Sequence, residues 1–447
     1  MTTIKDKATE IGIKTALNYI EKDPENNIKK IVDWLGKADK DEILTPYLTA
    51  IKPILNNPEN NWMKLIYSLF TDINPCVRKT LFENFVLNGM MLSAKKRDKV
   101  KAENDCNVPW AILLDPTSAC NLHCTGCWAS EYGNRLNLTL DEIDDIVKQG
   151  KELGVYMYIY TGGEPMVRKN DLIEICKRNP ECVFLAFTNA TLIDQVFAEQ
   201  MLEVGNFVPA ISIEGDEEAT DSRRGKGTYQ KVVKAMDVLK KNKLPFGASC
   251  CYTSANLDSI SSEVFMDSLV DFGCKFAWFF HYMPVGNDAV VDLLPNPKQR
   301  EQMYQRIRSF RENKPIFTID FQNDGEYVGG CIAAGRNYLH INPNGDVEPC
   351  VFIHYSDSNI RKKTLLEALC SPLFLAYKER QPFNCNHLRP CPMLENPEKL
   401  EEMVHLTNAH STDLQSKESV EHLCSKCKKY AENWAPMADK LWKENHN

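Results

Sequence analysis

Three cysteines stand within eight residues, in the stretch CNLHCTGC that runs from Cys120 to Cys127. Such a cluster of thiols has four possible explanations: a metal centre, a redox pair, a disulfide framework, or a chance arrangement. A structural zinc site normally takes four protein ligands, and His123 adjoins Cys124, which makes it a poor co-ligand. Three thiolates instead suit a 4Fe–4S cluster that keeps one iron open. We therefore predict that Cys120, Cys124 and Cys127 bind an iron–sulfur cluster, with zinc or chance as the alternatives.

Polar residues also follow the next three apolar segments of the chain. The stretches are YTGGEP with Gly162, Gly163 and Glu164, TNAT with Asn189, and SIEG with Ser212 and Glu214. Glycines let a ligand approach the backbone closely, and a carboxylate can hold an ammonium group. Residues two apart at a strand end share one face. A turn or a polar strand end would explain each stretch alone, but the ordered series favours a single site.

These motifs follow short apolar segments that alternate with helical ones from Pro109 onward. The expected strands are 110–115, 155–160, 183–187, 208–213, 246–251, 276–280 and 316–320. They are continuously apolar, which is typical of parallel strands buried on both faces, with helices as crossovers. The fold class is therefore α/β, either a βα barrel or an open sheet. Functional residues of such folds gather at the carboxyl ends of the strands, where Asp115 is placed to orient the cysteine loop.

The chain divides into three expected regions. Residues 1–107 have apolar residues near a 3.6-residue spacing and are predicted to be helical. Residues 108–322 carry the βα alternation, and residues 323–447 are rich in cysteines, prolines and loops. The first residues lack the apolar segment of a secretory signal, and no stretch approaches the ~20 apolar residues of a membrane span. We expect a cytoplasmic protein.

Composition narrows the chemistry. The 447 residues include 17 cysteines, an odd number in a large chain, which favours metal or redox chemistry over a disulfide scaffold. The net charge is −8, from 53 basic and 61 acidic residues, so nothing indicates binding to a nucleic-acid backbone.

Over roughly residues 108–320 the four motifs together resemble the radical S-adenosylmethionine (AdoMet) enzymes, and the C-terminal part resembles a SPASM or twitch extension. The resemblance implies a partial (β/α)6 barrel. It also implies a 4Fe–4S cluster that binds AdoMet at its open iron and cleaves it to a 5′-deoxyadenosyl radical, which removes a substrate hydrogen. The AdoMet contacts that it implies are Gly162, Gly163, Glu164, Asn189, Ser212, Glu214 and Arg224.

One residue departs from the pattern of that family. The position before the third cysteine is usually aromatic and packs near the adenine, but here it is Gly126, with Trp128 just after the motif. Trp128 is expected either to make the adenine contact or to belong to the core.

The C-terminal region repeats cysteines at a recognisable spacing. Thirteen residues separate Cys331 from Gly345, and four more separate Gly345 from Cys350, which resembles the opening signature of SPASM and twitch domains. Between them, LHINPNGDVEPC predicts a β-hairpin with an Asn-Gly turn.

Further cysteines imply one or two auxiliary 4Fe–4S clusters. Cys385 and Cys391 match the middle of the next SPASM motif, although Pro382 and Glu395 stand where its flanking cysteines would be. The expected ligands are Cys331, Cys350 and Cys391, then Cys424 and Cys427, then Cys385. The alternative is a tail stapled by zinc at Cys424 and Cys427.

The function that follows is an AdoMet radical enzyme acting on a peptide or protein, or on a lipid or small molecule. The helical N-terminal region lowers the expectation of a peptide, because peptide-modifying relatives often carry a winged-helix domain with strands. The apolar residues 61–92 could line an acyl-chain tunnel or touch a membrane, although packing against the barrel is favoured. A flavodoxin- or ferredoxin-type electron donor is expected.

Two alternatives and two catalytic candidates complete the predictions. The chain could be a non-catalytic iron–sulfur scaffold or electron carrier, or a zinc-stapled structural protein; the GGE and Ser-x-Glu motifs argue against both. His281 and Tyr282 follow strand 276–280 and are candidate proton or radical relays, with shaping of the pocket as the alternative.

Overall fold

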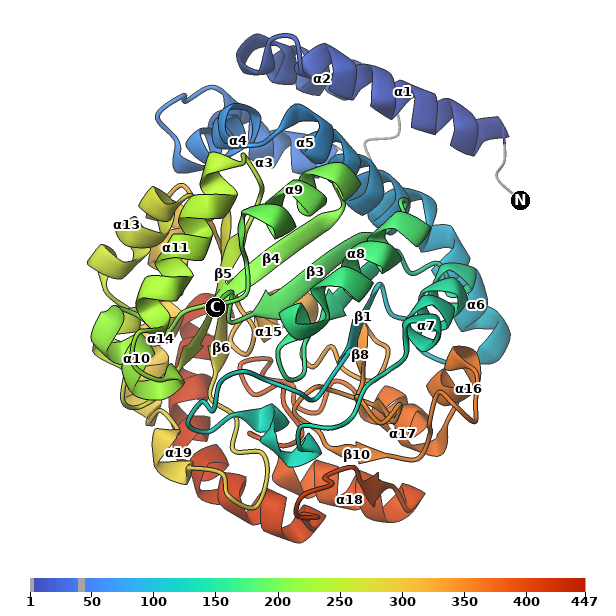
Figure 1. Cartoon of the computed structure of the whole chain (residues 1–447), viewed down its shortest axis with the longest axis vertical. Helices are drawn as coiled ribbons and strands as arrows, with labels where there is room; N and C mark the ends of the chain where they lie inside the picture. The colour runs from blue at the N-terminus through green and yellow to red at the C-terminus, as the bar shows by residue number, and fades with distance from the viewer. Residues whose placement is uncertain (1–3, 39–44, 447) are drawn as a thin grey trace.

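A computed structural model describes residues 4–38 and 45–446 (Figure 1). Its N-terminal region is helical, as predicted, although residues 39–44 of the predicted helical stretch lie outside the described residues. The elements are α1 (Ile4–Ile20), α2 (Pro24–Ala38), α3 (Thr45–Leu55), α4 (Asn61–Asp72), α5 (Pro75–Phe82), the π-helix η1 (Glu83–Leu92) and α6 (Ala94–Asn104). The π-helix was not anticipated by the helical pattern.

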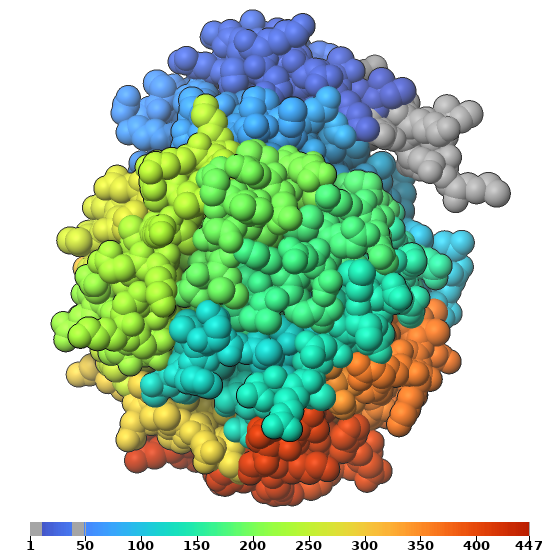
Figure 2. Space-filling model, in the orientation of Figure 1, coloured from blue at the N-terminus to red at the C-terminus, as the bar shows by residue number. Residues whose placement is uncertain are grey.

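The N-terminal helices form one end of the molecule (Figure 2), next to the end of the sheet where the strands begin (Figure 1). The buried Asn84 side chain donates to the carbonyls of Pro180 and Cys182 at 2.7 and 2.9 Å, immediately before the third strand. Lys275, just before the sixth strand, donates to Asp72 at 2.6 Å. The region is therefore hydrogen-bonded to the loops at this end of the barrel.

The central sheet holds seven parallel strands in sequence order. They are β1 (Ala111–Leu114), β2 (Met157–Tyr160), β3 (Val183–Thr188), β4 (Phe207–Ser212), β5 (Gly247–Tyr252), β6 (Phe276–His281) and β7 (Phe317–Asp320). Each coincides with a strand expected from the sequence, so the α/β partial-barrel prediction is confirmed. β1 and β2 are buried at every position, which accounts for their unbroken apolar sequence.

Helices and short turns connect the strands. The crossover elements are the 3-10 helix η2 (Trp128–Tyr132), α7 (Leu140–Leu153), η3 (Pro165–Arg168), α8 (Lys169–Arg178), α9 (Gln195–Val204), α10 (Glu217–Arg224), α11 (Thr228–Lys241), α12 (Leu257–Ile260), α13 (Glu263–Phe272), η4 (Val291–Leu293) and α14 (Pro297–Asn313). Capping boxes at Thr139 and Asn296 fix the starts of α7 and α14.

The C-terminal region extends the sheet. The predicted hairpin forms as β8 (Tyr338–Ile341) and β9 (Val347–Glu348), which pair antiparallel. β8 also pairs parallel with β1, in register from Ala111 with Tyr338 to Leu114 with Ile341. The other elements are α15 (Gly325–Val328), β10 (Tyr355–Ser356), α16 (Leu365–Leu369), α17 (Pro372–Arg380), α18 (Pro397–Thr407), β11 (His410–Ser411) and α19 (Val420–His446). In Figure 1 α16, α17 and α18 lie at the end of the molecule opposite the N-terminal helices.

Candidate active site

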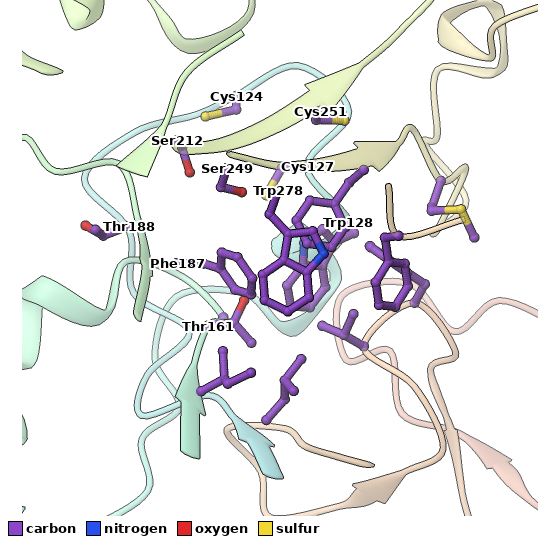
Figure 3. Close-up of a pocket in the computed structure, with 18 of the residues that line it drawn as sticks. Cys124, Cys127, Trp128, Thr161, Phe187, Thr188, Ser212, Ser249, Cys251 and Trp278 are labelled. Carbon is purple, nitrogen blue, oxygen red and sulfur yellow. The ribbon is translucent and has the colours of Figure 1, made fainter. Parts of the chain in front are cut away.

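The loop after β1 carries the cysteine triplet into a cavity at the carboxyl end of the sheet (Figure 3). Cys120, Cys124 and Cys127 all line this cavity. The GGE loop after β2 holds the cysteine loop, because the Gly163 and Glu164 N–H groups donate to Thr117 and Ala119 at 3.0 and 2.8 Å. The two motifs are therefore one structural unit.

Gly163 is required for that contact. A Cβ atom at this position would lie 2.3 Å from the Ala119 carbonyl oxygen and 2.5 Å from that of Ser118. Gly162 has φ +97°, a conformation that favours glycine, and a Cβ there would lie 2.7 Å from the Asp115 side chain. The glycines thus let the cysteine loop pass directly over the end of β2.

Glu164 lines the cavity but is only 2% exposed, and both of its oxygens accept hydrogen bonds. Oε1 accepts from Met166 N and Thr188 Oγ1 at 2.9 and 2.6 Å, and Oε2 accepts from Asn189 N at 2.7 Å. Asn189 in turn donates to Asn121 of the cysteine loop at 2.9 Å. The carboxylate therefore holds three strand-end loops together.

The thiols are electrostatically coupled. Partial removal from water, together with the charges of Glu164, Cys124 and Cys127, raises the pKa of Cys120 to about 11. Burial raises the pKa of Cys124, while Arg224 and Arg223 oppose that rise. The Leu122 N–H donates to Cys120 Sγ at 3.4 Å, the kind of contact that stabilises a thiolate ligand. These three free thiols beside two arginines suit an iron–sulfur cluster.

Ser212, Glu214 and Arg224 do not share one role. Ser212 and Arg224 line the cavity, whereas Glu214 is fully buried and is not part of its lining. Glu214 Oε1 accepts from Arg223 Nη1 and Arg224 Nε at 2.8 and 2.6 Å. The predicted contact of Glu214 with AdoMet stays untested; in this arrangement Glu214 positions the two arginines.

Tyr282 and Gly126 account for the departure from the family pattern. Gly126 has φ +66°, and a Cβ there would lie 2.7 Å from Cε2 of the Tyr282 ring. Tyr282 lines the cavity and receives a hydrogen bond from Val290 N at 3.1 Å. An aromatic ring from the residue that follows β6 thus occupies the space beside the third cysteine.

His281 is placed differently from Tyr282. Its Nδ1 lies 2.5 Å from the Tyr282 carbonyl oxygen, and its Nε2 lies 2.7 Å from the Tyr430 hydroxyl. Burial and the nearby charge of Arg300 hold its pKa well below the ordinary range. Both ring nitrogens are engaged and His281 lines the cavity, and its role as a relay stays a prediction.

Behind Trp128 lies a buried network that the sequence reasoning did not find. The Trp128 ring meets His340 edge-on at 5.8 Å. His340 Nε2 lies 3.0 Å from Asp115 Oδ1, and Nδ1 lies 2.6 Å from Glu348 Oε2. The two carboxylates raise the pKa of His340 to about 10 against the opposing effect of burial. The sequence did offer a signal for this network: His340 and Glu348 are polar residues among the apolar residues of the predicted hairpin.

A second group of thiols lies in the C-terminal region. Cys331, Cys350 and Cys391 interact electrostatically with one another. Tyr338 donates its hydroxyl to Cys350 Sγ at 2.8 Å, and Cys391 Sγ accepts from the N–H groups of Met393 and Leu394 at 3.4 Å each. Hydrogen bonds to sulfur are what iron–sulfur thiolates receive, so these three thiols suit a second cluster.

The other predicted ligands are partly near this group, because the charges of Cys331, Cys350, Cys391 and Cys424 all act on the buried Tyr377. Cys424 and Cys427 are buried on α19 and interact with each other, and Cys424 donates to the Pro397 carbonyl at 3.2 Å. Cys385 is exposed. Cys370 contacts the thiol of Cys106, away from the other cysteines. Among the residues that the structure describes, no three His, Cys, Asp or Glu side chains form a site for a single metal ion.

Comparison with known proteins defines the class. Residues 114–263 match the sequence model of the Radical SAM superfamily, and residues 331–392 match that of an iron–sulfur cluster-binding domain, SPASM. Residues 114–263 therefore form a Radical SAM domain and residues 331–392 a SPASM domain, and the predicted resemblance is confirmed. These domains imply AdoMet and 4Fe–4S clusters as cofactors.

Its relatives include enzymes with different substrates. The chain is 25% identical over 292 residues to the AdoMet-dependent heme synthase of Methanosarcina barkeri, covering 58% of this chain and 82% of that protein. It is 26% identical over 272 residues to the mycofactocin maturase MftC of Mycolicibacterium smegmatis, covering 56% and 66%. Its fold is similar to that of Streptococcus suis SuiB bound to the precursor peptide SuiA, with a TM-score of 0.55 at 19% identity, over 73% and 79% of the chains.

Proposed function

We propose that this protein is an AdoMet radical enzyme in which Cys120, Cys124 and Cys127 hold a 4Fe–4S cluster and the adjoining cavity holds AdoMet. The observation that carries the proposal is that three thiols, the GGE loop and Arg224 open on one cavity. When bound, the reduced cluster supplies the electron that splits AdoMet into methionine and a 5′-deoxyadenosyl radical, which removes a hydrogen atom from the substrate.

The chain's own residues supply position and charge. Gly162 and Gly163 keep the cysteine loop close to the end of β2, and Glu164 fixes the loop that carries Asn189. Arg223 and Arg224 place positive charge beside Cys124, where it favours the thiolate and would attract the AdoMet carboxylate. Tyr282 supplies the aromatic surface that Gly126 lacks.

A second cluster on Cys331, Cys350 and Cys391 belongs to the same proposal. An external donor of the flavodoxin or ferredoxin type would deliver the electron. None of the described helices is long and apolar enough to cross a membrane.

Anaerobic purification and reconstitution test the proposal. We expect broad absorbance near ~400 nm that bleaches with dithionite, and formation of 5′-deoxyadenosine from added AdoMet. A triple Cys120→Ala, Cys124→Ala, Cys127→Ala variant should lose about four irons per chain and all AdoMet cleavage. Cys76→Ala, at an exposed cysteine of α5, is the matched control and should change neither. Unchanged iron in the triple variant would refute the assignment.

A further inference from the structure

The cavity that begins at the three thiols continues along the inside of the barrel. At its far end it is lined by Trp110, Ala111 and Asn337, where β1 and β8 begin. Its charged side chains are Glu164, in the connection after β2, and Arg223 and Arg224, in the last turn of α10 after β4. In the proposed function AdoMet binds beside these three charged side chains. The remainder of the cavity, which has no charged lining among the residues that the structure describes, is then free for an uncharged substrate.

That remainder is lined mainly by aromatic and aliphatic side chains. Phe187 of β3 and Trp278 of β6 meet across the barrel with ring centroids 5.4 Å apart. Figure 3 shows Trp278 projecting into the middle of the cavity, with Ser212, Ser249 and Cys251 on one side of it. Leu113, Ile159, Phe280, Phe321, Ile332 and Phe352 contribute the other apolar surface. Such a lining favours an uncharged, apolar ligand.

One polar atom in this apolar part has no partner. The indole Nε1 of Trp278 is buried and makes no hydrogen bond to any described residue. A buried indole N–H normally donates to an acceptor. The N–H is therefore available to an oxygen atom of a ligand.

The far end of the cavity adjoins an exposed apolar surface. The Trp110 ring packs edge-on against Phe85 of η1 with centroids 6.1 Å apart. Residues five apart share a face of a π-helix, which places Met90 on the side of Phe85. Phe85, Met90 and Met91 are 38%, 54% and 47% exposed. Exposed apolar residues gathered at the end of an apolar cavity suit the passage of a hydrocarbon chain.

We propose that the substrate is lipid-like: an aliphatic chain with one uncharged oxygen that accepts a hydrogen bond from Trp278 Nε1. The chain then runs past Trp110 and leaves the barrel beside Phe85 and Met90. This inference rests on the proposed function and names its substrate class. A peptide is disfavoured because its backbone brings a donor and an acceptor at every residue, while the lining around Phe187 and Trp278 offers mainly the hydroxyls of Thr161, Ser212 and Ser249.

Brominated chains test the inference, because bromine quenches indole fluorescence on contact and Trp110, Trp128 and Trp278 line the cavity. The reconstituted protein is titrated with 11-bromo-1-undecanol, 11-bromoundecanoate and 1-bromododecane, and the alcohol is competed with acetyl-Leu-Ala-Leu-Ala-Leu-amide. We expect saturable quenching by the alcohol, at least about tenfold weaker binding of the carboxylate because its charge would be desolvated, and no competition by the peptide.

Two variants test where the aliphatic chain of the ligand lies in the cavity. Trp278→Phe keeps an aromatic ring but removes the N–H, so affinity for the alcohol should fall roughly threefold to tenfold, while affinity for 1-bromododecane should not change. Ala111→Leu narrows the far end and should weaken binding of 11-bromo-1-undecanol more than that of 6-bromo-1-hexanol. Melting temperature and cluster absorbance check that both variants fold.

Equal affinity for alcohol and carboxylate, competition by the peptide, absence of saturable quenching, or an unaltered alcohol affinity in folded Trp278→Phe would each overturn the inference. Formation of 5′-deoxyadenosine by the wild-type protein without any chain is measured separately. Failure of the substrate assignment is thus distinguishable from failure of the proposed function.

Discussion

The ring of Tyr282 lies where a side chain at position 126 would have to go: a Cβ on Gly126 would stand 2.7 Å from Tyr282 Cε2. The two residues are far apart in sequence but adjacent at the third cysteine of the cluster motif. The aromatic surface at this point therefore comes from the end of β6 instead of from the cysteine loop.

Removal of the Tyr282 ring should weaken AdoMet binding. We expect Tyr282→Ala to raise the dissociation constant roughly tenfold, since an aromatic contact contributes about 0.5–1.5 kcal/mol beyond its buried area. Tyr282→Phe keeps the ring and should bind within about twofold of wild type. Equilibrium dialysis with labelled AdoMet on reconstituted protein measures both, and equal affinities of the two variants would contradict the assignment.

The C-terminal thiols should bind iron independently of the first cluster. We expect Cys350→Ala and Cys391→Ala each to lower the iron content of the protein. Formation of 5′-deoxyadenosine from AdoMet should still be detectable, because neither thiol belongs to the cysteine loop of the first site. Cys370→Ala is the control within the same region, since its thiol contacts Cys106 instead. Iron analysis and electron paramagnetic resonance of the reduced proteins distinguish these outcomes.

His340 should stabilise the fold in a pH-dependent manner. Its pKa rises from an ordinary 6.5 to about 10 in the folded protein, because Asp115 and Glu348 flank it. A raised folded pKa gives stabilisation that is complete below about pH 6.5 and is lost as the pH rises through 10. His340→Gln should therefore lower the free energy of unfolding by about 3–5 kcal/mol at pH 6.

The difference in the free energy of unfolding between wild type and His340→Gln should become smaller as the pH approaches 10. Chemical denaturation of the variant and wild type in parallel at several pH values cancels the titration of other groups. A deficit that does not vary with pH would show that His340 is neutral in the folded protein.

Arg300 should contribute both to the free energy of unfolding and to iron binding by the second group of thiols. Its fully buried guanidinium donates to Glu395 Oε1 at 2.5 Å, and Glu395 Oε2 accepts from the N–H of Cys391 at 2.8 Å. We expect Arg300→Met to lower the free energy of unfolding by about 3–5 kcal/mol, because Glu395 would stay buried and unpaired. Iron bound by the C-terminal region should fall as well.

Arg306 provides the matched control on the same helix. It pairs with Glu263 at 3.4 Å, and the two side chains are 44% and 48% exposed. Arg306→Met should cost at most about 1 kcal/mol and leave the iron content unchanged. Similar effects of the two arginine variants would refute the special role of Arg300.

The strands and the first cysteine motif were predictable because their signals are local. An unbroken apolar run such as Ala111–Leu114 indicates a strand that is buried on both faces. The spacing of the cysteines indicates which of them are candidate ligands of one cluster. The pairing of β8 with β1 was not predictable, because it joins segments more than two hundred residues apart. The position of Tyr282 beside Gly126 likewise depends on barrel curvature, and the burial of Glu214 depends on two arginines that follow it.

The pairing of β8 with β1 limits where this chain can be cut. Ending it after residue 322 would leave β1 as an open sheet edge, with the backbone groups that face β8 unpaired and apolar side chains uncovered. Such an edge invites aggregation. The radical SAM portion is therefore not a module that can be transplanted alone: a functional exchange between family members would have to carry the hairpin to at least Glu348 along with the barrel.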